Sequence, residues 1–469
     1  MTECALGKIC RYRTENASTD QLPYLSTESM QPNKMGVIPS EAAPSVGKAR
    51  LFRKGDTLIS NIRPYFKKIW QAEYDGCCSA DVLVFEPHSC DSDYLYWLLS
   101  DDAFFAYMVA SSKGTKMPRG DKDAIMRYKV RRQSATEQRR LAAALNPIRE
   151  LIRISQRTND YLAELRNTLV KERISSALEH GIGNWRVVSL KDVAQIQSGY
   201  SYKSAELVAE SSIGMLGIKN FNRNGSFRSD GFKPLKPVKA KSAQYVALGE
   251  IVVAHTDLTQ NADIIGRAIQ VIDSGGYDQM VASLDLVKVT SLDDSISNEF
   301  LAALLSTEDF HNHCLGYVNG TTVLHLGKKA LPEYQLKIPE DMAIMSELDD
   351  AFKSIAQQQA ILIRESRHLE RIRDALLPKL ISGDIDVSKI EVSTPSNNHL
   401  SLRAIEMSNL NDLLVFEVPA LLREKAETKR KIHSISIRRI DCVLLNPDAF
   451  GHPFNTAPSY SGWQAKSGA

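Results

Sequence analysis

Residues that suit contact with nucleic-acid phosphates occur at corresponding places in the two halves of this 469-residue chain. A glycine–threonine pair follows a predicted short helix at residues 113–116 and again at 319–322. The backbone N–H groups and the hydroxyl of such a turn are suitable donors to phosphate oxygens. A helix end followed by an ordinary turn also favours glycine, so a purely structural role stays open. The residues of the two turns are Lys113, Gly114, Thr115, Lys116, Asn319, Gly320, Thr321 and Thr322.

Basic side chains cluster in three segments, although the formal net charge of the chain is only +2. Residues 48–68, 113–132 and 219–241 are each rich in lysine and arginine and poor in acids. Clusters of this kind neutralise phosphates, whereas a solvated protein face gives the same pattern without a ligand. The charge balance excludes a uniformly basic nucleic-acid binder. Further candidates in the first half are Arg63, Lys67, Lys68 and Arg119.

Polar and aromatic segments of the second half add more candidates. Two tyrosines and a lysine follow Gly199, residues 219–225 form a polar and basic loop, and a histidine ends a predicted strand. Asparagine and arginine make bidentate contacts with base edges in the major groove of DNA. An Asn–Gly pair is also typical of a plain turn. These candidates are Tyr200, Tyr202, Lys203, Lys219, Asn220, Asn222, Arg223 and His255.

Motifs that would indicate catalysis are missing. The sequence has no Walker A loop, no Gly-x-Gly-x-x-Gly after a strand and no His-Glu-x-x-His pair. Residues 446–450 are faintly similar to the Asn-Pro-Pro-Phe/Tyr loop of amino-methylating DNA methyltransferases, but the second proline is absent. His311, His313 and Cys314 have a metal-like spacing, yet the first half carries two aromatic residues and a methionine there. We therefore predict no catalytic, cofactor-binding or metal-binding residue.

The segments that carry the candidates occur twice. Residues 94–128 correspond to residues 300–334 at a constant offset of 206, so that Phe104 falls on Phe310. Upstream the offset falls to 194 and then to 184, and the second copy holds extra residues where loops are expected. A fixed period identifies repeated units, here of the size of a domain plus a connector. A repeated framework with unlike loops is typical of a shared scaffold with different binding surfaces.

A long amphipathic helix is predicted after each copy. Apolar residues recur at spacings of three and four, or multiples, from 141 to 169 and again from 348 to 376, which predicts two helices that pair along a seam. Ser134 and Glu137 predict a capping box at the first helix start, and Pro147 predicts an early break or kink. Polar residues interrupt the seam at Ser155, Asn159, Gln359 and Ser366, and glycines at 181, 183 and 383 end the helices.

Each repeated unit has a mixed pattern. Strands are predicted at 51–62 and 79–85 and at 250–255 and 283–289, and a short helix at 94–107 and at 300–313. We expect an α+β fold with two similar domains separated by long helices that pair as an antiparallel coiled coil. The expected boundaries are 1–133 for the first domain, 134–181 for the first spacer helix, 182–340 for the second domain, 341–384 for the second spacer helix and 385–469 for a C-terminal extension.

Composition is that of an ordinary soluble globular protein, with 43% hydrophobic and 24% charged residues. No apolar run is long enough to span a membrane, and the N-terminus has no apolar signal region. Seven cysteines without a framework spacing indicate a reducing compartment. We therefore expect a cytoplasmic protein.

Four segments together resemble a known family. Residues 376–385 resemble the stretch that ends the second helix of that family, and residues 136–140 resemble the opening of its first helix. Residues 185–190 followed by 199–204 resemble the start of a target-recognition domain. On these segments, the first 390 residues resemble the specificity subunit of type I restriction–modification systems.

The resemblance implies a non-catalytic DNA-recognition subunit. Each target-recognition domain would read one half of a bipartite, asymmetric site on double-stranded DNA, through the candidate residues named above. The helices would set the spacing between the half-sites and dock two methyltransferase subunits, and restriction or translocase subunits would join for cleavage. S-adenosylmethionine, ATP and Mg²⁺ are expected in these partner subunits and no cofactor is expected in this chain.

Two other functions stay open. A single-chain enzyme that recognises and modifies DNA is disfavoured by the missing motifs, and a coiled-coil scaffold that binds only proteins is disfavoured by the basic clusters beside unlike loops. The sequence also departs from the family. Residues 11–20 lack the Gly-aromatic-Ser pattern of the second copy, and residues 385–469 are expected to be disordered or foreign to the family.

Overall fold

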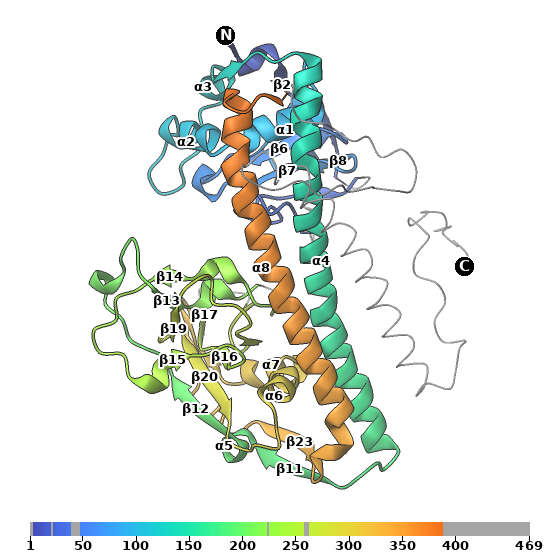
Figure 1. Ribbon diagram of the computed structural model, residues 1–469, viewed down its shortest axis with the longest axis vertical. Coiled ribbons are helices and arrows are strands. Elements are labelled where there is room, and N and C mark those ends of the chain that lie inside the picture. Colours follow the sequence, from blue (N-terminus) through green and yellow to red (C-terminus); the bar gives the residue numbers. More distant parts are fainter. Residues whose placement is uncertain (1–2, 20–21, 39–46, 223–224, 258–261, 388–469) are drawn as a thin grey trace, which may run out of the picture. The chain divides into compact units, whose positions relative to one another are not determined.

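The chain forms two α+β domains and two long paired helices in a computed structural model (Figure 1). The structure describes residues 3–19, 22–38, 47–222, 225–257 and 262–387. Arg223 and residues 446–450 lie outside the described residues. Within those ranges, no helix is long and apolar enough to cross a membrane.

The first domain is built on two four-stranded sheets. The strands of the antiparallel first sheet are, in order, β2 (Cys10–Tyr12), β9 (Val82–Pro87), β6 (Thr57–Ser60) and β7 (Ile69–Gln71). Those of the second sheet are β3 (Asn16–Ser18), β5 (Lys48–Phe52), β8 (Gly76–Cys78) and β4 (Tyr24–Leu25), with β4 parallel to β8. The strand predicted at 51–62 is divided between β5 and β6 because the chain turns at Gly55, whose φ is +93°.

Three short helices complete this domain. They are α1 (Ser92–Ser100), α2 (Asp102–Ala110) and α3 (Lys122–Met126). The single helix predicted at 94–107 is wrong, because Asp101 has an extended backbone and its carboxylate accepts the N–H of Ala103, which starts a new helix. The chain then pairs β10 (Lys129–Arg131) with β1 (Glu3–Ala5) before it enters the first long helix.

The second domain repeats this plan. Its first sheet has the order β12 (Ala194–Ser198), β20 (Leu286–Ser291), β16 (Ile251–Ala254) and β18 (Ala268–Gln270). Its second sheet has the order β14 (Lys233–Pro234), β13 (Ile213–Leu216), β19 (Gln279–Ala282) and β15 (Tyr245–Val246). Two helices, α6 (Asn298–Leu305) and α7 (Glu308–Leu315), replace the single predicted helix at 300–313, and β11 (Trp185–Ser189) pairs with β23 (Gln335–Pro339) after which the chain turns into the second long helix.

Strand pairing repeats in register between the domains. Tyr12 pairs with Phe85 in the first domain, and Ile196 pairs with Val289 at the corresponding place in the second. The parallel pairs β4–β8 and β13–β19 also correspond. One edge differs, because β3 lies beside β5 whereas β14 lies beside β13, on the opposite edge of the equivalent sheet. The repeat in the sequence is thus a repeat of the fold.

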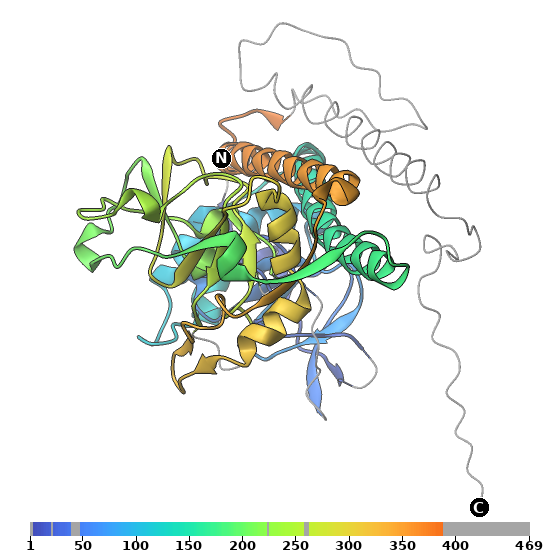
Figure 2. The ribbon, with the colours of Figure 1, turned by 90° about the horizontal axis from the view of Figure 1, so that it is seen from below.

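The long helices are α4 (Ala135–Glu179) and α8 (Ser346–Ser382), of 45 and 37 residues. They lie side by side in both views (Figures 1 and 2). They run antiparallel, because Gln133 and Arg131, just before α4, donate to the carbonyl oxygens of Leu380 and Ser382 at the end of α8. The predicted α+β fold with an antiparallel helical pair is confirmed.

Apolar and polar layers alternate along the helix pair. Leu162, Ile355 and Leu362 form a buried apolar cluster between the helices. The polar interruptions predicted at Asn159 and Gln359 meet each other, since Gln359 Nε2 donates to the Asn159 carbonyl oxygen at 3.2 Å. A polar layer of this kind fixes the register of a coiled coil at some cost in stability.

The long helices begin and end close to where the sequence predicted, but the proline inside α4 does not interrupt it. The capping box of Ser134 and Glu137 is present, and Gly383 ends α8 with a φ of +83°. The predicted break at Pro147 is wrong, because α4 continues through it. The preceding Asn146 accepts the indole N–H of Trp97 and donates to Asp93, so tertiary contacts with α1 hold this turn in place.

Candidate nucleic-acid interface

The glycine–threonine turn of the first domain is the tip of a small hairpin. Lys113 and Arg119 face each other as an antiparallel bridge, with reciprocal N–H···O distances of 2.8 and 2.9 Å. Gly114 has a φ of +94°, which a β-carbon makes unfavourable. Arg119 also bridges Ile62, in the segment that follows the central strand β6. The hairpin therefore lies beside the end of the central strand.

An equivalent hairpin occupies the same place in the second domain. It is formed by β21 (Val318–Asn319) and β22 (Leu324–Leu326), and β22 pairs with β17 (Thr256–Asp257) after the central strand β16. Gly320 has a φ of +109°, and a β-carbon there would lie 2.3 Å from the carbonyl oxygen of Val323. Glycine is needed at this tip for both reasons.

The two hairpins match residue by residue. Asn319 pairs with His325 and His325 with Thr256, as Lys113 pairs with Arg119 and Arg119 with Ile62. These correspondences have the offsets of 206 and 194 found in the sequence. The backbone is therefore shared, whereas a lysine and an arginine in one domain are an asparagine and a histidine in the other.

Ion pairs hold part of the basic surface of the first domain. Lys113 Nζ lies 2.6 Å from Asp121, and this contact together with the Ala124 N–H lowers the pKa of Asp121 to about 2. Arg119 makes a bidentate contact with Asp81, with a shortest distance of 3.0 Å. These pairs are largely open to solvent, so they are weak and exchangeable.

Other predicted cations of this domain have different surroundings. Lys67 Nζ lies 2.8 Å from Asp102, and Lys68 Nζ donates to the Thr27 carbonyl oxygen at 2.7 Å. Arg63 and Lys116 make no salt bridge among the described residues. Lys116 is exposed at the hairpin tip with Gly114 and Thr115. Arg63, Lys113, Lys116 and Arg119 are thus brought together, whereas Lys67 and Lys68 are tied to neighbouring segments.

The corresponding surface of the second domain has less charge. Asn319, Thr321 and Thr322 are exposed at the tip, and His325 replaces the arginine. Asp285, at the position of Asp81, accepts the hydroxyl of Thr256 at 2.8 Å. His255 lies beside it, and burial together with the nearby His325 lowers the pKa of His255 below its usual value. The His255 imidazole is therefore largely neutral near pH 7.

Two predicted contacts, Tyr200 and Asn220, are incompatible with the structure. The hydroxyl of Tyr200 is buried and donates to Glu206 at 2.6 Å. Asn220 is fully buried, accepts the N–H of Gly217 and donates to the carbonyl oxygen of Arg228. Both side chains stabilise the domain interior, because their polar groups are satisfied there.

The remaining predicted residues of the second domain stay predictions. Tyr202 is half-buried against the cluster around Leu235. Asn222 donates to the Ser226 hydroxyl at 2.8 Å inside a tight hairpin. Lys203 and Lys219 are exposed.

The structure adds an aromatic pair that the sequence analysis missed. Tyr65 and Phe66 lie in a 3₁₀ turn, η2 (Pro64–Phe66), and are 48% and 37% exposed. The turn directly follows Arg63, whose N–H donates to the Pro118 carbonyl oxygen at 2.8 Å. The only sequence signal was the position of these rings inside a basic segment, since aromatic residues ordinarily predict a core.

The histidine–cysteine segment has packing contacts. Cys314 is buried in the core of the second domain, and His313 Nε2 lies 2.8 Å from the Ala330 carbonyl oxygen. His311 is buried, and its Nδ1 has no hydrogen-bond partner among the described residues. Within the described residues, no three histidine, cysteine, aspartate or glutamate side chains are grouped as a metal site would require.

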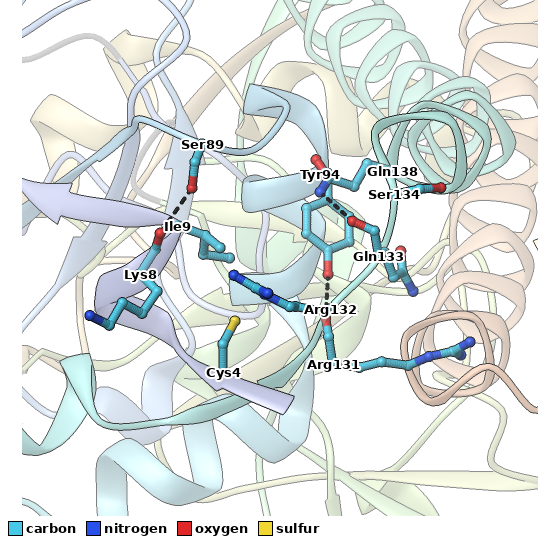
Figure 3. Close-up of a pocket in the computed structure, with 10 residues that line it drawn as sticks. All are labelled: Cys4, Lys8, Ile9, Ser89, Tyr94, Arg131, Arg132, Gln133, Ser134 and Gln138. Carbon is cyan, nitrogen blue, oxygen red and sulfur yellow. Dashed lines mark hydrogen bonds between the residues drawn. The ribbon is translucent and has the colours of Figure 1, made fainter. Parts of the chain in front are cut away.

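A cavity of 330 Å³ lies at the start of α4 (Figure 3). Its wall includes the basic residues Lys8, Arg131 and Arg132. Arg131 is engaged in hydrogen bonds within the protein. The Tyr94 hydroxyl donates to the carbonyl oxygen of Arg131, and the guanidinium of Arg131 extends to Ser382 of α8. This cavity belongs to the junction of the helices with the first domain.

Comparisons with known proteins show which proteins this chain is similar to. Residues 182–364 match the family described as the type I restriction modification DNA specificity domain. The MjaVIII specificity subunit of a type I restriction enzyme from Methanocaldococcus jannaschii is 25% identical over 389 residues, which are 78% of this chain and 87% of that protein. The MjaIX specificity subunit from the same organism is 22% identical over 334 residues, covering 64% of this chain and 70% of that protein.

Solved structures of the same kind are also similar. The type I restriction–modification S subunit from M. genitalium is 15% identical, covers 81% of this chain and 96% of its own, and has a TM-score of 0.42. The HsdS subunit from Thermoanaerobacter tengcongensis is 18% identical, covers 82% and 97%, and has a TM-score of 0.30. The family match and the two relatives confirm the resemblance to type I specificity subunits.

Proposed function

We propose that this chain, as a type I specificity subunit, recognises a bipartite and asymmetric site on double-stranded DNA. The observation that carries the proposal is the pair of equivalent hairpins, at 113–119 and 318–326, whose backbones match and whose exposed side chains differ. Two copies of one scaffold with unlike edges suit two unlike half-sites. A protein with a single target would not need both.

Contacts to phosphates and to bases are divided among these residues. Lys113, Lys116 and Arg119 offer cations to the phosphate backbone, which positions a protein without reading sequence. Asn319 and His325 offer hydrogen-bonding groups suited to base edges or sugar–phosphate oxygens. The first domain therefore depends more on charge than the second.

Catalysis is assigned to partner subunits. His313 and Cys314, which had a metal-like spacing, make packing and hydrogen-bonding contacts inside the second domain. The sequence has no cofactor motif. We propose that two methyltransferase subunits dock on the helices and carry S-adenosylmethionine, and that restriction subunits use ATP and Mg²⁺. The chain itself would then supply specificity without turnover.

Methylome mapping tests this proposal. Cells that express the chain with its cognate methyltransferase subunit should methylate a split site, and the purified chain alone should transfer no methyl group. Methyl transfer by the chain alone would instead support a single-chain enzyme. Methylation without a bipartite motif, or stable binding of the partner with no DNA binding, would favour a protein scaffold.

A further inference from the structure

The aromatic pair of the first domain is exposed on a rigid turn. The rings of Tyr65 and Phe66 have centroids 4.7 Å apart, and neither has another ring neighbour among the described residues. Tyr74, which is also partly exposed, rests instead against Phe52 and Trp70. Phe66 is the one phenylalanine among the exposed large apolar residues of the described chain. The two adjacent rings form one continuous apolar patch, and contiguous apolar patches rimmed by polar residues mark interaction sites.

Backbone geometry holds the pair outward. Arg63 and Lys67, which flank the turn, have φ values of 50° and 51°, in the left-handed region that non-glycine residues seldom adopt. Pro64 starts the turn and is buried. The carbonyl oxygen of Phe66 accepts the N–H of Asn33 at 2.8 Å. A left-handed backbone at a non-glycine residue persists only when the surrounding structure fixes it. Such conformations are frequent at ligand-binding sites.

The surroundings of the pair are basic. The Arg63 N–H bonds to Pro118 in the strand of the hairpin that ends at Arg119, so the turn and the hairpin are neighbours. Arg63 and Lys116 lack a salt bridge among the described residues, and Arg119 keeps half of its side-chain surface exposed at 50%. Apolar rings inside a basic rim fit a polyanion with apolar faces between its charges, and DNA has this character.

We infer that the Tyr65–Phe66 turn enters a groove of DNA and contacts bases of the half-site read by the first domain. This inference rests on the proposed function and assigns a specificity role to two residues. Arg63 and Lys116 would hold the phosphates, while the rings would meet base edges, thymine methyl groups or a partly unstacked step. Residues 257–267 of the second copy lie between the strands that correspond to β6 and β7, and they contain no tyrosine or phenylalanine, so the device belongs to the first half-site.

Binding of the complete complex with its methyltransferase subunits tests the inference. The Tyr65→Ala/Phe66→Ala variant should bind its cognate DNA roughly ten- to a hundredfold more weakly, because lost base contacts cost about as much as a mismatched pair. The slope of affinity against salt should not change, because no phosphate contact is lost. Discrimination at one or two positions of the first half-site should relax, and the second half-site should be read as before.

Two matched variants separate base contact from folding. The exchange Tyr65→Phe/Phe66→Tyr keeps both rings and should restore most of the affinity. Tyr74→Ala removes a partly exposed ring of the same domain that packs on Phe52 and Trp70, and it should leave base discrimination intact. Thermal unfolding of each variant shows whether the first domain is folded.

Three results would overturn the inference. Unchanged affinity and discrimination in the folded double-alanine variant would remove the turn from the DNA interface. Weaker assembly with the methyltransferase subunits, at unchanged base preference, would make the turn a protein-docking surface. Failure of the unaltered complex to discriminate any DNA sequence would overturn the proposed function and this inference together.

Discussion

The two domains differ at their edges far more than in their interiors. Phe104 and Phe310 are fully buried at equivalent positions, and the central strands β6 and β16 are buried at every residue. At the hairpins, by contrast, Arg119 corresponds to His325. Packing in the interior therefore determines the shared framework. Residues on the exposed hairpins can differ between the domains and so suit different ligands.

The ion pairs beside the two central strands also differ between the domains. Asp56 precedes the central strand of the first domain and takes Arg13 as its bidentate partner, at 2.7 and 3.0 Å. Glu250 has the equivalent place in the second domain, but its partner is Lys288 at 3.1 Å, from another strand. A carboxylate occupies the same position in both domains and is paired with a cation in each. The cation comes from a different part of the fold in the two domains.

The largest expected effect concerns the spacer between the domains. Insertion of four residues after Leu169 lengthens α4 by about 6 Å, which should widen the non-specific gap of the DNA site by ~2 base pairs at about 3.4 Å each. Both half-sites should stay as they were. Methylome mapping of the active insertion variant measures the gap, and an unchanged gap would show that the helices do not set it.

The next effect compares the carboxylates at the start of the two central strands. Asp56→Ala should lower the free energy of unfolding by about 3 kcal/mol, since it removes the bidentate partner of the buried Arg13. Arg13 then keeps only its longer contacts with Glu86 at 3.3 Å and Glu15 at 3.7 Å. Glu250→Ala should cost less, about 1–3 kcal/mol, because the Lys288 side chain is 13% exposed and also donates to the Tyr245 carbonyl oxygen. Urea denaturation measures both. The double variant Arg13→Met/Asp56→Leu should recover most of the loss, and failure to recover would assign it to packing.

A smaller effect separates the two hairpins electrostatically. Lys113→Ala/Lys116→Ala should weaken binding to all DNA sequences alike and reduce the salt slope by roughly one per lost phosphate contact. The matched variant Asn319→Ala/Thr322→Ala should leave the slope unchanged, since no charge is removed. Binding titrations at several salt concentrations measure this. A changed base preference with an intact slope in the lysine variant would make those lysines base readers.

The smallest effect is a pH dependence confined to the second domain. Burial and the nearby Arg267 lower the pKa of His311 below its usual 6.5, and the first domain has Phe105 at this position. The His311 imidazole therefore binds a proton more tightly in the unfolded chain than in the folded protein. Its contribution to the free energy of unfolding is present in full above pH 6.5 and is lost as the pH falls toward the folded-state pKa. His311→Phe should flatten the decline of stability below pH 6.5, measured by urea denaturation across that range. An equally steep decline would place the acid sensitivity elsewhere.

The repeat and the helix pair were predictable because they depend on apolar spacing. Positions such as Leu162 and Leu369 are buried as their periodicity requires, and Ser134 caps α4 as predicted. Tertiary contacts were not predictable from spacing. Asn146 holds a helix turn that Pro147 was expected to break, and Asp101 divides one expected helix into two.

The candidate site was predicted in part. Glycine–threonine turns were found because glycine marks a backbone that other residues avoid, and the structure brings both to the ends of the central strands. Tyr200 was assigned to the surface because its partner Glu206 is not recognisable as such in the sequence. Tyr65 and Phe66 were missed for the opposite reason, since only the structure shows that aromatic rings there face solvent.

Exchange of the first domain tests the central claim most directly. Residues 1–131 are replaced by the first domain of a type I specificity subunit whose DNA site is known, and the site of the hybrid complex is mapped by methylome sequencing. One half-site should change to that of the donor, while the second half-site and the gap stay the same. A change in both halves, or in neither, would contradict the claim that each domain reads its own half-site.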